Sequence, residues 1–101
     1  MIILVNLRKI KPSKPYDIII DRRSVLGNPF FMNYENERNY VCDKYKFWFK
    51  EQIKSNNKIK NELNRLKNIL LKYGKLRLFC WCTPKRCHGE TIKKYLLQNK
   101  D

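Results

Sequence analysis

Residues 78–92, Leu-Phe-Cys-Trp-Cys-Thr-Pro-Lys-Arg-Cys-His-Gly-Glu-Thr-Ile, contain the features that indicate the fold most strongly. A run rich in aromatic and aliphatic residues over 76–82 predicts a β-strand, bounded by Gly74 before it and by a Thr-Pro turn after it. Apolar residues at helical spacing resume at Ile92, which predicts a last helix directly after Cys87 and His88. Three of the four cysteines and the only histidine therefore lie at one corner between a strand and a helix.

Outside this stretch, strand patterns come first and helix patterns follow. Continuous apolar runs predict strands at 2–7 and 16–20, and apolar residues at helical spacing predict helices at 41–53 and 59–73. Gly74 is the expected C-terminal cap of the second helix. Because strands buried on both faces are typical of parallel sheets, we expect an α/β fold, a small and mostly parallel sheet with helices packed on it, in a single domain over 1–101. Residues after Leu97 are expected to fray.

The charge of the chain indicates a polyanionic ligand. The sequence has 23 Lys plus Arg against 9 Asp plus Glu, which gives a formal net charge of +14 and a pI near 9.9. Such a field attracts DNA, RNA or a nucleotide, so nucleotide or nucleic acid is the expected partner. The alternative is that lysine fills the solvated surface of a chain from an AT-rich genome.

The composition also bears on the compartment. No apolar run approaches membrane-spanning length, and the N-terminal apolar run is too short for a secretory signal. We therefore expect no membrane association and a cytoplasmic location, where the 4 cysteines stay reduced.

The Cys-His corner has three interpretations. Cys80, Cys82, Cys87 and His88 have the number and types of ligands of a tetrahedral zinc site, although their spacing is unusual. Alternatively, Cys87 and His88 stand beside an anion bound at the start of the last helix, where backbone N–H groups lack partners. In the third interpretation, Cys80 and Cys82 are small buried hydrophobes and His88 caps the helix.

Arg38 lies on the apolar stripe of the first helix. It precedes Val41 by three positions and Tyr45 by seven, so it extends the face that packs on the core. A charge on that face needs a partner. It therefore either reaches an anion at the Cys-His corner, or pairs with Glu35 or Glu37 in the first turn.

Two motifs carry a family resemblance. Arg23-Ser24-Val25-Leu26-Gly27-Asn28-Pro29-Phe30, followed by Arg38, and Leu78-Phe79-Cys80-Trp81-Cys82-x-Pro84-x-x-Cys87-His88-Gly89, resemble the family called domain of unknown function 4326, over about 20–97. The ending is also similar to domain of unknown function 488, in which an acidic residue tends to stand at the place of Cys82. That similarity implies that Cys82 is replaceable, which counts against an obligatory zinc site. The resemblance implies small stand-alone domains of bacteria, phages or large DNA viruses, and it implies no activity.

From these observations we expect one polar pocket at the strand ends, holding a phosphate-bearing ligand. Arg23 and Arg38 would bind the anion, Asn28 would orient the ligand or its own loop, and Cys80 would line the floor beside Cys82. Cys87 and His88 are the candidate catalytic residues, and Asp21 is the one nearby acid that could orient the histidine. No carboxylate pair, Walker loop or complete triad indicates a reaction, so whether the chain is an enzyme stays open. We expect no metal cofactor, with zinc as the alternative.

Two other functions remain open. The first is a nucleic-acid-binding or ribonucleoprotein component, with a structural zinc or a vestigial pocket, whose affinity falls steeply with salt. The second is a protein-interaction module for an acidic partner.

Overall fold

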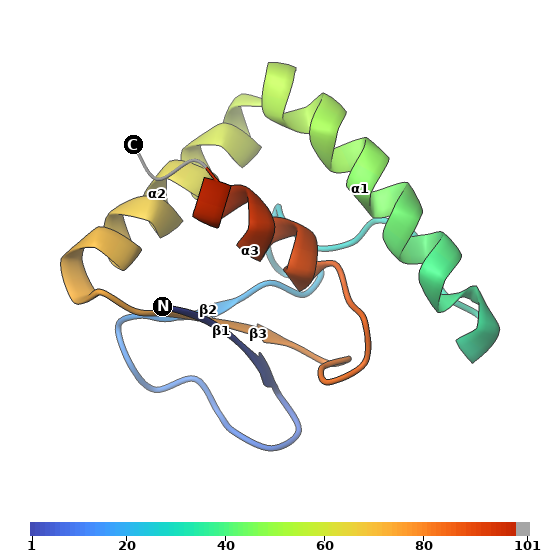
Figure 1. Ribbon diagram of the computed structural model, residues 1–101, viewed down its shortest axis with the longest axis horizontal. Helices are drawn as coiled ribbons and strands as arrows, with labels where there is room; N and C mark the ends of the chain where they lie inside the picture. Colours follow the sequence, from blue (N-terminus) through green and yellow to red (C-terminus); the bar gives the residue numbers. More distant parts are fainter. Residues whose placement is uncertain (99–101) are drawn as a thin grey trace.

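The computed structural model describes residues 1–98, which form a parallel sheet with helices packed on one face (Figure 1). In chain order the elements are β1 (Ile2–Asn6), β2 (Asp17–Ile19), the 3-10 helix η1 (Glu35–Glu37), α1 (Arg38–Ser55), α2 (Asn57–Tyr73), β3 (Leu76–Cys80) and α3 (Gly89–Gln98). The strands lie in the order β1-β3-β2, and both pairings are parallel. This arrangement confirms the predicted α/β fold with a small, mostly parallel sheet.

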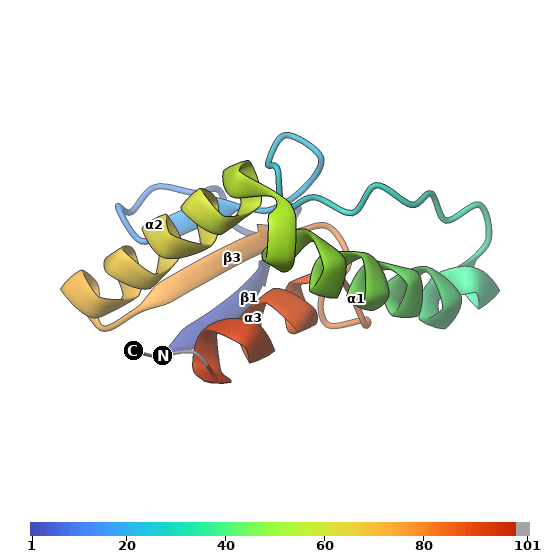
Figure 2. The same cartoon turned by 90° about the horizontal axis from the view of Figure 1, so that it is seen from above.

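The main core lies between the sheet and the helices. Leu76, Leu78 and Cys80 alternate along β3 onto this face, where they belong to the same buried cluster as residues of α1, α2 and α3. α2 and α3 lie over the sheet, whereas the first half of α1 extends beyond it (Figures 1 and 2). The chain passes from α1 to α2 at Asn56, whose side chain accepts a hydrogen bond from the Ile59 amide and caps α2.

The opposite face of the sheet is covered by the connection from β1 to β2, residues 7–16 (Figure 1). Arg77 and Phe79 of β3 point to this side, because they alternate with the core residues. Asp17 stands beside Arg77 in the register of β2 and β3, and its carboxylate accepts two hydrogen bonds from the guanidinium at 2.6 and 2.8 Å. The same carboxylate accepts the Ser13 and Lys14 amides at 2.9 Å. The Asp17 carboxylate therefore joins β2 to β3 and to the connection that precedes β2.

The central strand is shorter than its sequence predicts. The apolar pattern extends over 76–82, but β3 ends at Cys80 because the next carbonyl groups turn toward a side chain of β1. Asn6 Nδ2 donates to the carbonyl oxygens of Trp81 at 3.3 Å and Thr83 at 2.8 Å. The Trp81–Thr83 segment therefore leaves the sheet as a turn, and Cys82 does not continue the alternation of the strand.

The helix boundaries agree well with the sequence patterns. Gly74 caps α2 in the left-handed region with φ of 69°, as predicted. Helix α3 includes Gln98, and the rest of the segment expected to fray lies outside the described residues. Within residues 1–98, no helix combines the length and the apolar character needed to cross a membrane.

Candidate functional site

A cavity of about 400 Å³ lies at the carboxyl end of the sheet. Three segments line it: the loop that follows β2, the first turns of α1, and the connection between β3 and α3. Parallel strands place their carboxyl ends at one edge, so residues that are distant in sequence meet there. Loops after the strands of open α/β sheets are a usual place for ligand sites.

Five of the six predicted site residues line this cavity, namely Arg23, Asn28, Arg38, Cys87 and His88. The sixth, Cys80, is only 1% exposed and lies behind Cys87, with 3.4 Å between their sulfur atoms. Cys82, predicted on the floor, is half-buried and lines the cavity. The structure thus brings the two sequence motifs together in one place.

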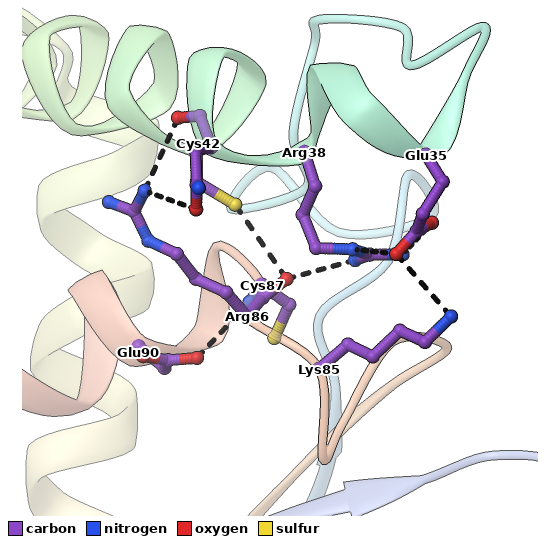
Figure 3. A network of polar contacts seen from close by, with 8 residues as sticks. Glu35, Arg38, Cys42, Lys85, Arg86, Cys87 and Glu90 are labelled. Carbon is purple, nitrogen blue, oxygen red and sulfur yellow. Dashed lines mark hydrogen bonds and ion pairs between the residues drawn. The ribbon is translucent and has the colours of Figure 1, made fainter.

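Arg38 pairs with Glu35, as one interpretation of its position predicts, and it also lines the cavity. Its Nε and Nη2 donate to the Glu35 carboxylate at 2.9 Å, and its Nη1 donates to the Arg86 carbonyl oxygen at 2.9 Å (Figure 3). The guanidinium lowers the pKa of Glu35 to about 2, and Lys85 adds a smaller effect. Arg38 therefore pairs with Glu35, lines the cavity, and joins α1 to the turn before α3.

Arg86 anchors the same turn from the other side. Its guanidinium donates to Asp43 at 2.8 Å and to Asn39, both on α1, while its carbonyl oxygen accepts from Arg38. The Cys42 thiol lies 3.8 Å from that carbonyl oxygen (Figure 3). One peptide group thus receives contacts from two residues of α1 that stand four positions apart, on one helical face.

Asp21 organises the loop after β2 instead of the histidine. Its carboxylate accepts hydrogen bonds from Arg23 at 2.7 to 3.1 Å and from the Trp81 indole Nε1 at 3.1 Å. These bonds, chiefly the one from Arg23, hold the pKa of Asp21 below its usual range. Among the described residues Asp21 makes no hydrogen bond to His88, so the expectation that it orients this imidazole is wrong.

Asn28 orients its own loop. Its side-chain oxygen accepts the Phe30 amide at 2.9 Å, and its carbonyl oxygen accepts from Arg22 Nε at 3.2 Å. The Arg22 guanidinium lies 3.9 Å from the centre of the Phe31 ring. Within residues 1–98, neither terminal nitrogen of Arg22 has a hydrogen-bond partner, so this guanidinium is the least engaged of those that line the cavity.

His88 is held in one orientation. Its Nε2 lies 2.6 Å from the Ile20 carbonyl oxygen, which accepts only, so Nε2 carries the proton and Nδ1 carries the lone pair. The Tyr45 ring packs edge-on at 5.1 Å, and Tyr45 in turn donates to the Leu26 carbonyl oxygen at 2.6 Å. Burial lowers the pKa of His88, so the imidazole is neutral at pH 7.

The two buried thiols act as one titrating pair. The Cys87 thiol lies against Cys80 and also accepts the Gly89 amide at 3.3 Å. The hydrogen bond between the sulfur atoms lowers the pKa of Cys80 and, together with burial, raises the pKa of Cys87. In the part of the chain that is described, no hydrogen bond joins the side chains of Cys87 and His88, so these neighbours do not form a thiol-imidazole pair.

The start of α3 is already capped. The Cys87 amide donates to the Glu90 carboxylate at 3.2 Å, and the Gly89 amide is taken by Cys87 Sγ. The N–H groups that the sequence offered to an anion therefore have partners within the chain.

Of the residues in the alternative zinc interpretation, Cys80 and Cys87 lie together, whereas His88 is held by another partner. The Nε2 atom of His88 points to Ile20, and Cys80 lies behind Cys87. Across residues 1–98, no three side chains of His, Cys, Asp or Glu are grouped so as to hold a metal ion.

Three charged or thiol side chains of the lining, those of Arg22, Cys42 and Arg86, were not predicted from the sequence, and neither were the aromatic rings of Phe31 and Trp81. A signal existed for Cys42, because it follows Arg38 by four positions and so shares its helical face. Arg22 and Arg86 each stand next to another basic residue in a loop. Because a loop has no regular periodicity, the sequence does not show which of the two neighbours lines the cavity.

The lowered pKa of His88 predicts that the protein loses folding stability as the pH falls. The unfolded chain protonates the imidazole near its ordinary pKa of about 6.5, whereas the folded chain resists protonation. Stability should therefore fall as the pH drops from about 6.5 toward 5, before most carboxylates titrate. Urea unfolding across this range should show the slope in the wild type and lose it in His88→Gln. His88 is the only histidine of the sequence. An unchanged slope in the variant would therefore show that a group other than a histidine causes the pH dependence.

A family model described as domain of unknown function (DUF4326) matches residues 5–98 of the chain. No curated protein and no solved structure matches the chain.

Proposed function

This chain belongs to the DUF4326 family, and we propose that its cavity binds a phosphate-bearing ligand, either a nucleotide or a phosphate of a nucleic acid. The observation that carries the proposal is the charge of the lining. Four guanidinium groups line the cavity, those of Arg22, Arg23, Arg38 and Arg86, against the single carboxylate of Asp21. Guanidinium groups bind phosphate through planar, paired hydrogen bonds, which makes arginine the usual residue for this task.

Size and position support the same ligand class. A volume of about 400 Å³ is within the range of small-molecule and cofactor sites. The terminal nitrogens of Arg22 have no hydrogen-bond partner among residues 1–98, and each of the other three arginines is anchored by a carboxylate that fixes its orientation. A fixed guanidinium loses less freedom on binding than a mobile lysine does.

The proposal assigns binding and leaves the reaction unassigned. The lone carboxylate of the lining is held by Arg23 and Trp81, and Cys87 and His88 face separate partners. Within this proposal, Nδ1 of neutral His88 is the atom that would accept a proton or a hydrogen bond from the ligand. The Cys87 thiol stays protonated beside Cys80, as the raised pKa of Cys87 requires.

We further propose that the site works without zinc and that the protein is cytoplasmic. The support is the contact of His88 with Ile20, together with four free thiols of the kind that a reducing compartment preserves. Metal analysis of protein purified without chelator should find no stoichiometric zinc. One zinc per chain would contradict the metal-free site.

Thermal unfolding with a ligand panel tests the main proposal. At a nucleotide concentration about 100 times its Kd, the Tm should rise by about 13 °C, since such binding stabilises a small domain by about 2.7 kcal/mol. Arg38→Ala should weaken binding by about 10- to 100-fold, the usual cost of a charged hydrogen-bonding group, and remove about half of the shift or more at the same nucleotide concentration. No shift with any nucleotide or with inorganic phosphate would overturn the proposal.

The matched control is Lys50→Ala. Lys50 is an exposed cation of α1 that lines none of the cavities described here, so its loss removes the same charge and should leave the shift intact. Because Arg38 also holds Glu35 and the Arg86 carbonyl group, Arg38→Ala will lower the Tm of the ligand-free protein. Each variant is therefore compared with itself, with and without ligand.

A further inference from the structure

A second cavity, of about 610 Å³, lies between the loop after β2 and helix α2. Arg23, Lys58 and Arg65 line it, together with one carboxylate, Glu62. Arg23 also lines the first cavity, so the two cavities adjoin at this side chain. Its guanidinium is held by Asp21 yet is 63% exposed, and it therefore stands at the boundary with its position fixed.

Positive charge continues from the first cavity into the second. The first cavity has four arginines to one acid, and the second has three basic side chains to one acid. Lys58 is exposed and has no ion pair among the described residues, whereas Arg65 pairs with Glu62 at 2.7 Å. A single phosphate needs only the first set of cations. A second set that adjoins the first at Arg23 suits a ligand with several phosphates in a row.

The first cavity also offers planar apolar surfaces. Trp81 is 47% exposed and Phe31 is 71% exposed, and both line this cavity. The bond from the indole to Asp21 fixes Trp81, and the Arg22 guanidinium lies over the Phe31 ring. Unpaired bases stack on aromatic rings and on guanidinium planes, whereas the bases of a duplex are already stacked on one another.

We propose that the two cavities form one track for a single-stranded nucleic acid. A base stacks against Trp81 or the Arg22 and Phe31 pair, Arg23 binds the phosphate at the boundary, and the following phosphates continue toward Lys58 and Arg65. The inference rests on the proposed function, because it extends the ligand from one phosphate-bearing group to a strand.

Affinity as a function of ligand length tests the track. Binding is measured for a mononucleotide, for a single strand of about 12 nucleotides, which is within the usual site size of single-strand-binding modules, and for the matching duplex. We expect the strand to bind at least about 10-fold more tightly than the mononucleotide and than the duplex. Trp81→Leu should weaken the binding of the mononucleotide and of the single strand by about 10-fold each, because the stacking contact is lost.

The double variant Lys58→Ala/Arg65→Ala separates the two cavities. It should lower the affinity for the strand by about 10-fold and leave the affinity for the mononucleotide unchanged. Lys50→Ala/Lys94→Ala, which removes the same charge from exposed positions outside both cavities, is the control and should retain strand affinity within about 2-fold. Equal affinity for strand and mononucleotide, an equally tight duplex, or equal effects of the two double variants would overturn the track. Binding of mononucleotide alone would leave the proposed function standing, and binding of neither would overturn both.

Discussion

Replacing Gly27 by alanine should unfold the loop that forms one wall of the cavity. A Cβ atom at this position would collide with the Asp21 carbonyl oxygen and would lie 2.7 Å from the Arg22 Cα and 2.8 Å from the Asp21 carbonyl carbon. All three are backbone atoms, so no side-chain rotation relieves the contact. The turn closes on itself through the Ser24 and Gly27 amides, at 2.9 and 3.0 Å, and it has to open.

The expected cost is about 3 kcal/mol or more of unfolding free energy, since overpacking against backbone is at the upper end of its usual range. For a domain of this size, that corresponds to a fall in Tm of about 15 °C. Ligand binding should weaken in the same variant, because Arg22, Arg23 and Asn28 move with the turn. Urea and thermal unfolding measure the first effect, and the nucleotide-induced shift in Tm measures the second.

Gly74→Ala is the matched control. Gly74 has φ of 69°, where alanine is strained, but a Cβ atom there meets nothing within 4 Å. The expected loss is about 1 kcal/mol, with ligand binding unchanged, because the cap of α2 is remote from the cavity. Equal losses in the two variants would show that the backbone around Gly27 shifts at little cost and relieves the contact with Asp21 and Arg22.

Replacing Asp17 by alanine should cost about 3 kcal/mol, the lower end for breaking a buried ion pair. The Asp17 side chain is 1% exposed and Arg77 is 18% exposed, so the remaining guanidinium would be left mostly buried and unpaired. The Ser13 and Lys14 amides would lose their acceptor as well. Glu51→Ala, which breaks an ion pair with both side chains at least 70% exposed, should change stability by less than about 0.5 kcal/mol.

The loss in Asp17→Ala should depend on pH. Hydrogen bonds from Arg77 hold the pKa of Asp17 well below its usual range. A lowered folded-state pKa means that the stabilisation is complete above the unfolded pKa of about 3.9 and is lost as the pH falls toward the folded value. The gap in unfolding free energy between wild type and variant should therefore be constant from pH 7 to about 5 and narrow below about pH 4. A gap that stays constant down to pH 2 would show that the variant loses packing rather than the ion pair.

Local patterns were sufficient for the secondary structure. Apolar periodicity identified α1 and α2, Gly74 marked the end of α2, and the apolar runs gave the three strands, because these signals depend on neighbours within one or two turns. The extent of β3 was the exception. A side chain of β1, that of Asn6, draws the Trp81 and Thr83 carbonyl groups out of the sheet, and the two segments are more than 70 residues apart in the chain.

The candidate site was likewise predictable from the sequence only in part. The sequence by itself determined which residues are candidates for the site and that most of them follow strands, and the carboxyl ends of parallel strands lie at one edge of the sheet. Only the tertiary structure decided their partners. Asp21 pairs with Arg23 and Trp81 instead of His88, the Ile20 carbonyl group fixes the imidazole, and Cys80 is covered by Cys87. Such choices depend on distances of about 3 Å between segments whose relative placement is set by the packing of the helices on the sheet, and no spacing along the chain encodes them.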